Sequence, residues 1–88
     1  MPELPDPATP LYNHPLPALE HWLRSLGAVQ QSRNPCLWNL HHEDWHAEIE
    51  LEVEELTVRW MKGNQRSLRQ FPYGLSRTDM EAAILAGP

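Results

Sequence analysis

The chain has 88 residues, of which 41% are hydrophobic, and this length and composition are typical of one small domain. No apolar run approaches the roughly 20 residues that cross a bilayer, and the N-terminus lacks the basic patch and apolar stretch of a signal peptide. The single cysteine, Cys36, cannot form an internal disulfide, which favours a reducing, cytoplasmic compartment. The net charge is −5, but seven of the twelve acids lie in residues 43–55 and five of the seven basic residues lie in residues 59–77.

The first ten residues hold four prolines and almost nothing apolar. We therefore predict a flexible arm over residues 1–10 and a single domain over residues 11–88. A helix is predicted from about Leu16 to Leu26, with Pro15 at its start and Gly27 as its C-terminal cap. Its apolar stripe consists of Leu16, Leu19, Trp22, Leu23 and Leu26.

Two strands are expected next, over residues 28–31 and 36–41, on either side of the turn sequence SRNP. Pairing of the second strand with the one that follows is expected to place the large Trp38 beside the small Ala47. The side chains that alternation directs inward in this second strand are Cys36, Trp38 and Leu40.

The stretch WHAEIELEVEELTVRWM, residues 45–61, has the clearest pattern in the chain. Apolar and polar residues alternate through its first half and alternate again, with the opposite parity, from Leu56, which predicts a β-hairpin that turns at residues 54–55. A longer loop in the same register, or one bent strand with a bulge, is the alternative, because Glu-Glu is not a favoured two-residue turn. The predicted register places Glu50 opposite Arg59 as an exposed ion pair. On the buried face it pairs Val53 with Leu56, Leu51 with Val58, and Ile49 with Trp60.

The last third of the chain is predicted to contain a turn at residues 62–65, a weaker fifth strand at 66–71 that Pro72 ends, and a C-terminal helix. Two overlapping capping patterns can start this helix, namely Ser76 with Asp79 or Thr78 with Glu81. Its buried face is expected to carry Met80, Ala83 and Ile84. The order helix, meander, helix predicts an α+β fold, with an antiparallel sheet of three to five strands and both helices on one face.

Four tryptophans fall on predicted inward faces, namely Trp22, Trp38, Trp45 and Trp60. At about 200 Å² each and about 25 cal/mol/Å², their burial is worth about 20 kcal/mol, which a domain this small needs for its stability. We therefore interpret them as core residues and not as a ligand-stacking site.

Three segments, TPLYNHPLPALEHWLRSLG, AEIELEVEELTVRW and LSRTDMEAAILAGP, resemble a small family found chiefly in cyanobacteria and catalogued as domain of unknown function 3143. The resemblance covers nearly the whole chain after the proline arm. It implies a cyanobacterial cytosolic or plastid-stromal setting, and it brings no activity, cofactor or catalytic residue.

Residues 41–46, HHEDWH, gather imidazoles and carboxylates near Cys36, and all three ligand types bind zinc. However, no C-x-x-C or H-E-x-x-H spacing is present, and alternation sends neighbouring side chains to opposite faces. We interpret this segment as a solvated turn and expect no metal. No nucleophile with a base, and no carboxylate pair in a cleft, is recognisable. The sequence thus predicts a protein that is not an enzyme and needs no cofactor.

The candidate binding residues form an acid-free segment, here called the basic tract: Arg59, Lys62, Arg66, Arg69, Phe71, Tyr73 and Arg77. We hypothesise a small interaction module, of the adaptor or assembly-factor type, that docks this tract onto an acidic surface of another protein or assembly. The alternative is an RNA- or ribosome-associated protein, in which the basic groups contact phosphate and exposed aromatic rings stack on bases. An isoelectric point of about 5.4 and the neighbouring acidic strand favour the protein partner. The oligomeric state is left open.

Overall fold

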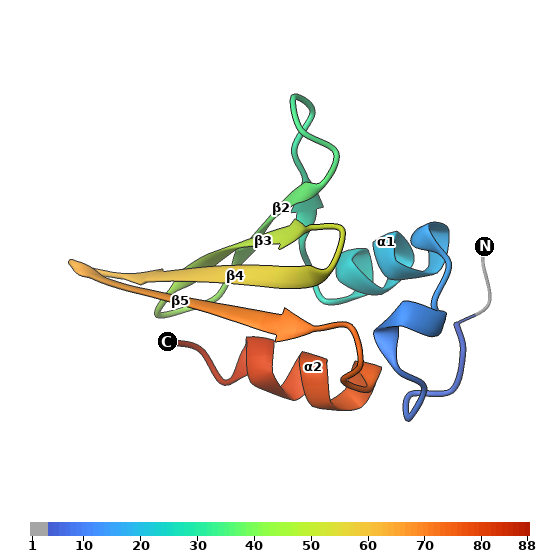
Figure 1. Ribbon diagram of the computed structural model, residues 1–88. Coiled ribbons are helices and arrows are strands. Elements are labelled where there is room, and N and C mark those ends of the chain that lie inside the picture. The colour runs from blue at the N-terminus through green and yellow to red at the C-terminus, as the bar shows by residue number, and fades with distance from the viewer. Residues whose placement is uncertain (1–3) are drawn as a thin grey trace.

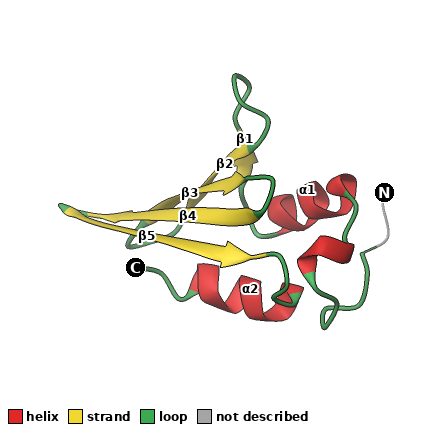
Figure 2. Cartoon of the chain, in the orientation of Figure 1, coloured by secondary structure: helices red, strands yellow, loops and turns green. Residues whose placement is uncertain are grey.

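The computed structural model describes residues 4–88 and confirms the predicted α+β fold (Figure 1). Within these residues, one antiparallel sheet has the strand order β1-β2-β3-β4-β5. The strands are β1 (Val29–Gln30), β2 (Leu37–His41), β3 (His46–Leu51), β4 (Glu55–Lys62) and β5 (Gln65–Pro72). The helices are a short 3-10 helix, η1 (Leu11–Asn13), the N-terminal α1 (Leu16–Ser25) and the C-terminal α2 (Arg77–Leu85). Figure 2 shows the long β4–β5 hairpin projecting away from the end of the molecule that holds α1.

The ends of the helices follow from local chemistry. The Ser76 hydroxyl accepts a hydrogen bond from the Asp79 backbone N–H at 3.1 Å, so the first of the two predicted capping patterns starts α2. Gly27, with φ of 97°, follows α1 in the left-handed conformation that glycine adopts without strain. Helix α1 ends at Ser25, one residue before the predicted end at Leu26.

One core joins both helices to the same face of the sheet. The four tryptophans are all buried, as predicted. The Trp60 indole N–H donates to the Ile84 carbonyl of α2 at 3.1 Å, and the Trp22 indole N–H donates to the Glu81 carboxylate at 3.0 Å. The packing residues of this core include Trp22 and Leu23 of α1, Met80 and Ile84 of α2, and Ile49, Val58 and Trp60 of the sheet. The opposite face, here called the open face, carries the row Asn39, Glu48, Arg59 and Leu68.

The β3–β4 hairpin forms as predicted, but its register was wrong by two residues. The observed pairs on the buried face are Leu51 with Leu56, Ile49 with Val58, and Ala47 with Trp60. The chain turns through Val53 and Glu54, and the Glu52 N–H donates to the Glu55 carbonyl at 3.0 Å. Val53, predicted inward, is therefore 97% exposed at the tip of the turn. A shift of two residues leaves every side chain on its predicted face, so alternation cannot detect it.

The register of the β2–β3 pairing also differs from the prediction by two residues. Trp38 lies opposite Ile49, while Ala47 lies between Leu40 on one side and Trp60 on the other. The small side chain still relieves crowding between large ones, but beside different neighbours. Cys36 precedes β2 and is exposed, so its predicted inward placement was wrong.

Residues 4–10 are bound to the domain, contrary to the prediction of a flexible arm. Leu4 packs against the hydrophobic core. Two backbone N–H groups at the start of α2 donate to this segment, Thr78 to the Pro7 carbonyl at 3.0 Å and Arg77 to the Thr9 carbonyl at 3.1 Å. Backbone hydrogen bonds leave no signature in composition, so composition alone predicts a flexible segment here. Residues 1–3 of the predicted arm lie outside the described residues.

Candidate functional site

The fold divides the basic tract among several surfaces. Arg59 and Arg66 project from the open face, whereas Arg69 lies on the other face of β5. Lys62 is exposed at the β4–β5 turn, where Gly63 adopts a φ of 58°. Arg77 is half-buried at the start of α2, apart from the strands. Arg66 and Arg69 thus belong to β5, whereas Arg59 and Lys62 belong to β4.

Arg59 is neutralised within the sheet. Its Nη1 lies 3.3 Å from Oε1 of Glu50, so the predicted ion pair forms. Its geometry differs from the prediction, because Glu48 lies directly opposite Arg59 and Glu50 is reached diagonally. Both side chains are partly exposed, which makes the pair worth about 0.2 to 1 kcal/mol.

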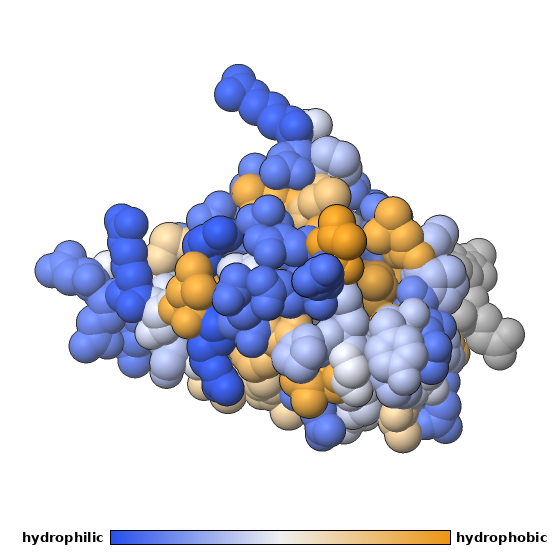
Figure 3. All heavy atoms as spheres, viewed as in Figure 1, coloured by the Kyte–Doolittle hydropathy of each residue, from blue (hydrophilic) through white to orange (hydrophobic). Residues whose placement is uncertain are grey.

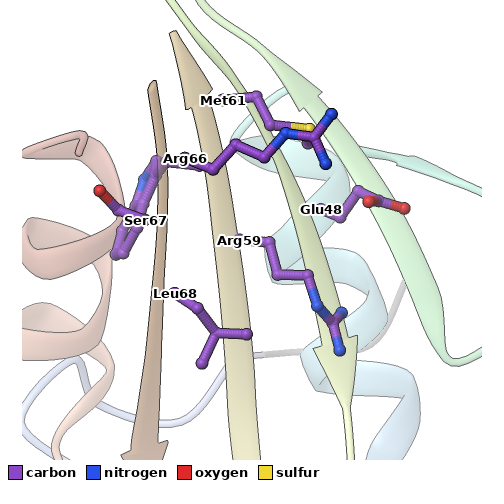
Figure 4. A pocket seen from close by; sticks show the side chains of 7 residues that line it. Glu48, Arg59, Met61, Arg66, Ser67 and Leu68 are labelled. Atoms are coloured by element: carbon purple, nitrogen blue, oxygen red, sulfur yellow. The ribbon is translucent and has the colours of Figure 1, made fainter. Parts of the chain in front are cut away.

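A shallow hollow lies on the open face around Arg59 and Arg66 (Figure 4). Figure 4 shows the Arg66 side chain extending over Met61 towards β3, with Arg59, Glu48 and Leu68 around the same hollow. Its volume is about 240 Å³, below the roughly 300 to 1,000 Å³ of small-molecule pockets. The open face therefore has the form of a contact surface and not of a deep binding pocket.

Strand β5 presents basic groups on both of its faces. Arg66 and Arg69 are exposed, and between them Leu68 leaves 55% of its surface in solvent. The Arg69 guanidinium carbon lies 4.9 Å from the centroid of the Phe71 ring, a cation–π contact that holds this side chain against the strand. In the sheet of residues 4–88, β5 is the last strand and pairs with β4 alone. Its other lateral edge is here called the β5 edge.

The two aromatic residues of the basic tract are not free to stack on bases. Phe71 is only 4% exposed and packs edge-on against Trp60 at 6.4 Å, so the expectation of an exposed ring was wrong. Tyr73 is half-buried, and its hydroxyl donates to the Glu52 carbonyl. Burial and the nearby charges of Glu52, Cys36 and Glu55 raise the pKa of Tyr73 to about 12. Its phenol is thus a fixed hydrogen-bond donor.

The histidine-rich turn between β2 and β3 packs its aromatic rings in pairs. His42 stacks on Trp45 with ring centroids 4.7 Å apart, and His41 lies 5.7 Å from His46. Among residues 4–88, no group of three or more His, Cys, Asp or Glu side chains is placed to hold a metal ion. Cys36 lies at the far end of β2 from this turn. These rings therefore serve the packing of the turn.

An apolar groove that the sequence pattern does not reveal lies where the β3–β4 turn faces η1 and the start of α1. Its volume is about 420 Å³. The pattern predicts Leu16 on the buried stripe of α1 and Val53 on the buried face of the hairpin, yet both are exposed and line this groove. The signal that remained in the sequence was the apolar Val53 among four glutamates, at a position where a turn is normally polar.

No helix within residues 4–88 is long and apolar enough to span a membrane. A model of the family described as "Protein of unknown function (DUF3143)" matches residues 26–87 of the chain. No curated protein and no solved structure matches it. The description of the family names no activity, substrate or partner, so the function has to be argued from the surfaces of the chain itself.

Proposed function

Because the chain belongs to the DUF3143 family of proteins of unknown function, we propose its role from its own surface, as a small non-catalytic protein-interaction module. The proposed partner is a protein or assembly that presents an extended acidic segment. The docking surface is the β5 edge. The observation that carries the proposal is an eight-residue edge strand with exposed Arg66, Leu68 and Arg69.

Strand addition fits the chemistry of this edge. An edge strand offers unpaired N–H and C=O groups at alternate residues, which an extended segment can pair with. Arg66 and Arg69 point to opposite faces, so an added strand meets a guanidinium on each face and an apolar contact at Leu68. Arg66 and Arg69 would repel the same arginines of a second copy of β5. Pro72, the last residue of β5, has no backbone N–H and so interrupts the row of hydrogen-bond donors. The edge therefore selects an acidic partner over self-association.

An RNA partner has less support in the geometry. Phe71 is in the core, the Tyr73 hydroxyl is occupied, and Arg59 is paired with Glu50. What remains for a phosphate backbone is Arg66 and Arg69 of β5 with Lys62 at the turn, and they lack a stacking platform. A cytosolic, cyanobacterial setting is part of the same proposal and is supported by the single, unpaired thiol and the segments quoted above.

The test is capture of partners from a native extract, with and without nuclease. Reversal of charge in Arg66→Glu with Arg69→Glu should abolish capture and leave the protein folded, because both side chains are exposed and the cation–π contact of Arg69 is worth only about 0.5 to 1 kcal/mol. Arg33→Glu, an exposed reversal in the β1–β2 loop, is the matched control and should retain capture. Arg59→Ala should weaken capture less than Arg69→Ala, since Arg59 already has a partner.

Hydrogen exchange of the captured complex then tests strand addition directly, through slower exchange of β5 amides. Release of the partner by nuclease, or unchanged capture by the double reversal, would overturn the proposed function. Protection confined to another surface would retain the interaction module but reject the β5 edge as its site.

A further inference from the structure

The apolar groove is a second surface, at the opposite end of β4 from the β4–β5 turn. Figure 3 shows hydrophobic side chains gathered where the β3–β4 turn faces α1, apart from those over β4 and β5. The residues that line the groove are Leu11, Tyr12, His14, Leu16, Leu19, Cys36, Leu51, Glu52, Val53 and Tyr73. Its volume of about 420 Å³ is the size of a binding pocket for bulky side chains.

The walls of the groove carry exposed apolar side chains that the fold does not need at these positions. Tyr12 is 65%, Leu16 58% and Val53 97% exposed. Val53 sits at the tip of a tight turn, where a polar residue would be equally compatible with the backbone. Neighbouring exposed apolar side chains around a concave surface are typical of a protein-binding site.

The charge around the groove is of one sign. Among the described residues that line it, Glu52 is the single carboxylate and no Lys or Arg is present. Glu54 adjoins Val53 and is exposed. Burial is the largest cause of the raised pKa of Tyr73, and the negative charges of Glu52 and Glu55 raise it further. The groove is thus the electrostatic opposite of the β5 edge.

We propose that this groove binds a protein segment that inserts a bulky apolar side chain and carries Lys or Arg beside it. The apolar walls take the inserted side chain, and Glu52 and Glu54 pair with the flanking cations. A second copy of the chain fits poorly, because a two-fold contact would bring Glu52 and Glu54 of both copies together. An anionic lipid surface is repelled by the same carboxylates.

The probes are three short peptides: KKLFLKK, the acidic match EELFLEE, and KKSGSKK without apolar side chains. The first readout is alkylation of Cys36, which is the single cysteine, is exposed and lines the groove. KKLFLKK should slow alkylation in proportion to its concentration, and the other two peptides should not. The chemical-shift changes that KKLFLKK causes in the protein should centre on Tyr12, Leu16 and Val53.

Variants place the binding in the groove. Val53→Ser should weaken KKLFLKK binding about tenfold, the usual effect of losing an apolar anchor. Val29→Ser removes another exposed valine, from β1, and should leave the affinity for KKLFLKK unchanged. Glu52→Gln should also weaken binding, and this loss should disappear in high salt. The double charge reversal at Arg66 and Arg69 should not reduce the affinity for KKLFLKK. This result separates binding in the groove from the proposed function of the β5 edge.

Equal binding of EELFLEE and KKLFLKK would overturn the charge requirement, and equal affinity of Val53→Ser and wild type would overturn the site. A concentration-dependent dimer that Val53→Ser dissociates would assign the groove to a second copy and reject the proposal.

Discussion

Tyr73 connects three parts of the molecule through one side chain. It follows β5, lines the apolar groove, and donates its hydroxyl proton to the Glu52 carbonyl in the β3–β4 turn. Ionisation would remove this donor and place a phenolate near Glu52 and Glu55. Burial of the phenol is the largest cause of its pKa shift, and together with the charges of Glu52, Cys36 and Glu55 it raises the pKa from 10.0 to about 12.

This shift predicts a pH dependence of stability with a definite sign. In the unfolded chain the phenol ionises near 10.0, whereas in the folded protein it stays neutral to about 12. The stabilisation by Tyr73 is therefore complete below pH 10.0 and is lost as pH rises towards 12. Tyr73→Phe lacks the titrating group, so the gap in melting temperature between wild type and variant should narrow across this range. A constant gap would contradict the raised pKa.

At the level of single residues, burial was largely predictable from alternation. The period-two pattern placed Ile49, Val58 and Trp60 inward correctly because a strand has only two faces. Phe71 was missed because an aromatic residue among arginines resembles a nucleic-acid-binding signature, while the neighbouring Trp60 that buries it lies eleven positions away in the sequence. Contacts of this kind depend on tertiary structure.

At the level of elements, alternation predicted the strands but not their register. Both hairpins were placed two residues from their true pairing, since a shift of two preserves the faces. The turns decide the register, and Glu52 to Glu55 closes a turn that has none of the usual glycine or asparagine signals. The apolar groove was hidden for the same reason, because its wall depends on Val53 being in the turn and not in the strand.

The N-terminal segment behaves as a cap for α2. The first N–H groups of any helix lack partners within the helix, and here the carbonyls of Pro7 and Thr9 accept two of them. The Thr78 hydroxyl adds a further hydrogen bond to the Pro7 carbonyl at 3.1 Å. Composition alone made this segment look dispensable, whereas the structure gives it a role in starting α2.

Deletion of residues 1–9 should therefore destabilise the domain, by about 1 to 3 kcal/mol for the two lost backbone hydrogen bonds. Deletion of residues 1–6 is the control, because it keeps the carbonyls of Pro7 and Thr9 and removes the core contact of Leu4. Urea unfolding of the three chains measures the difference. Equal stability of the shorter deletion and the longer one would show that these hydrogen bonds do not hold α2.

At the level of the whole molecule, the two proposed surfaces carry opposite charges. The β5 edge carries Arg66 and Arg69, and the apolar groove carries Glu52 with Glu54 beside it. Arg69 lies four residues before Tyr73 of the groove, roughly 13 Å along an extended chain. At this separation, substitutions at the two surfaces should act additively.

The two proposed surfaces should therefore accept their partners independently. Arg69→Glu should change the affinity for KKLFLKK by less than about twofold, and Glu52→Gln should leave capture by the β5 edge intact. Added salt should weaken both interactions, because exposed charges are screened beyond about 8 to 10 Å in physiological buffers. The measurement is a titration of KKLFLKK with and without the captured partner, at two salt concentrations. If the partner displaces the peptide, or one substitution weakens both interactions, then the β5 edge and the groove are parts of a single site.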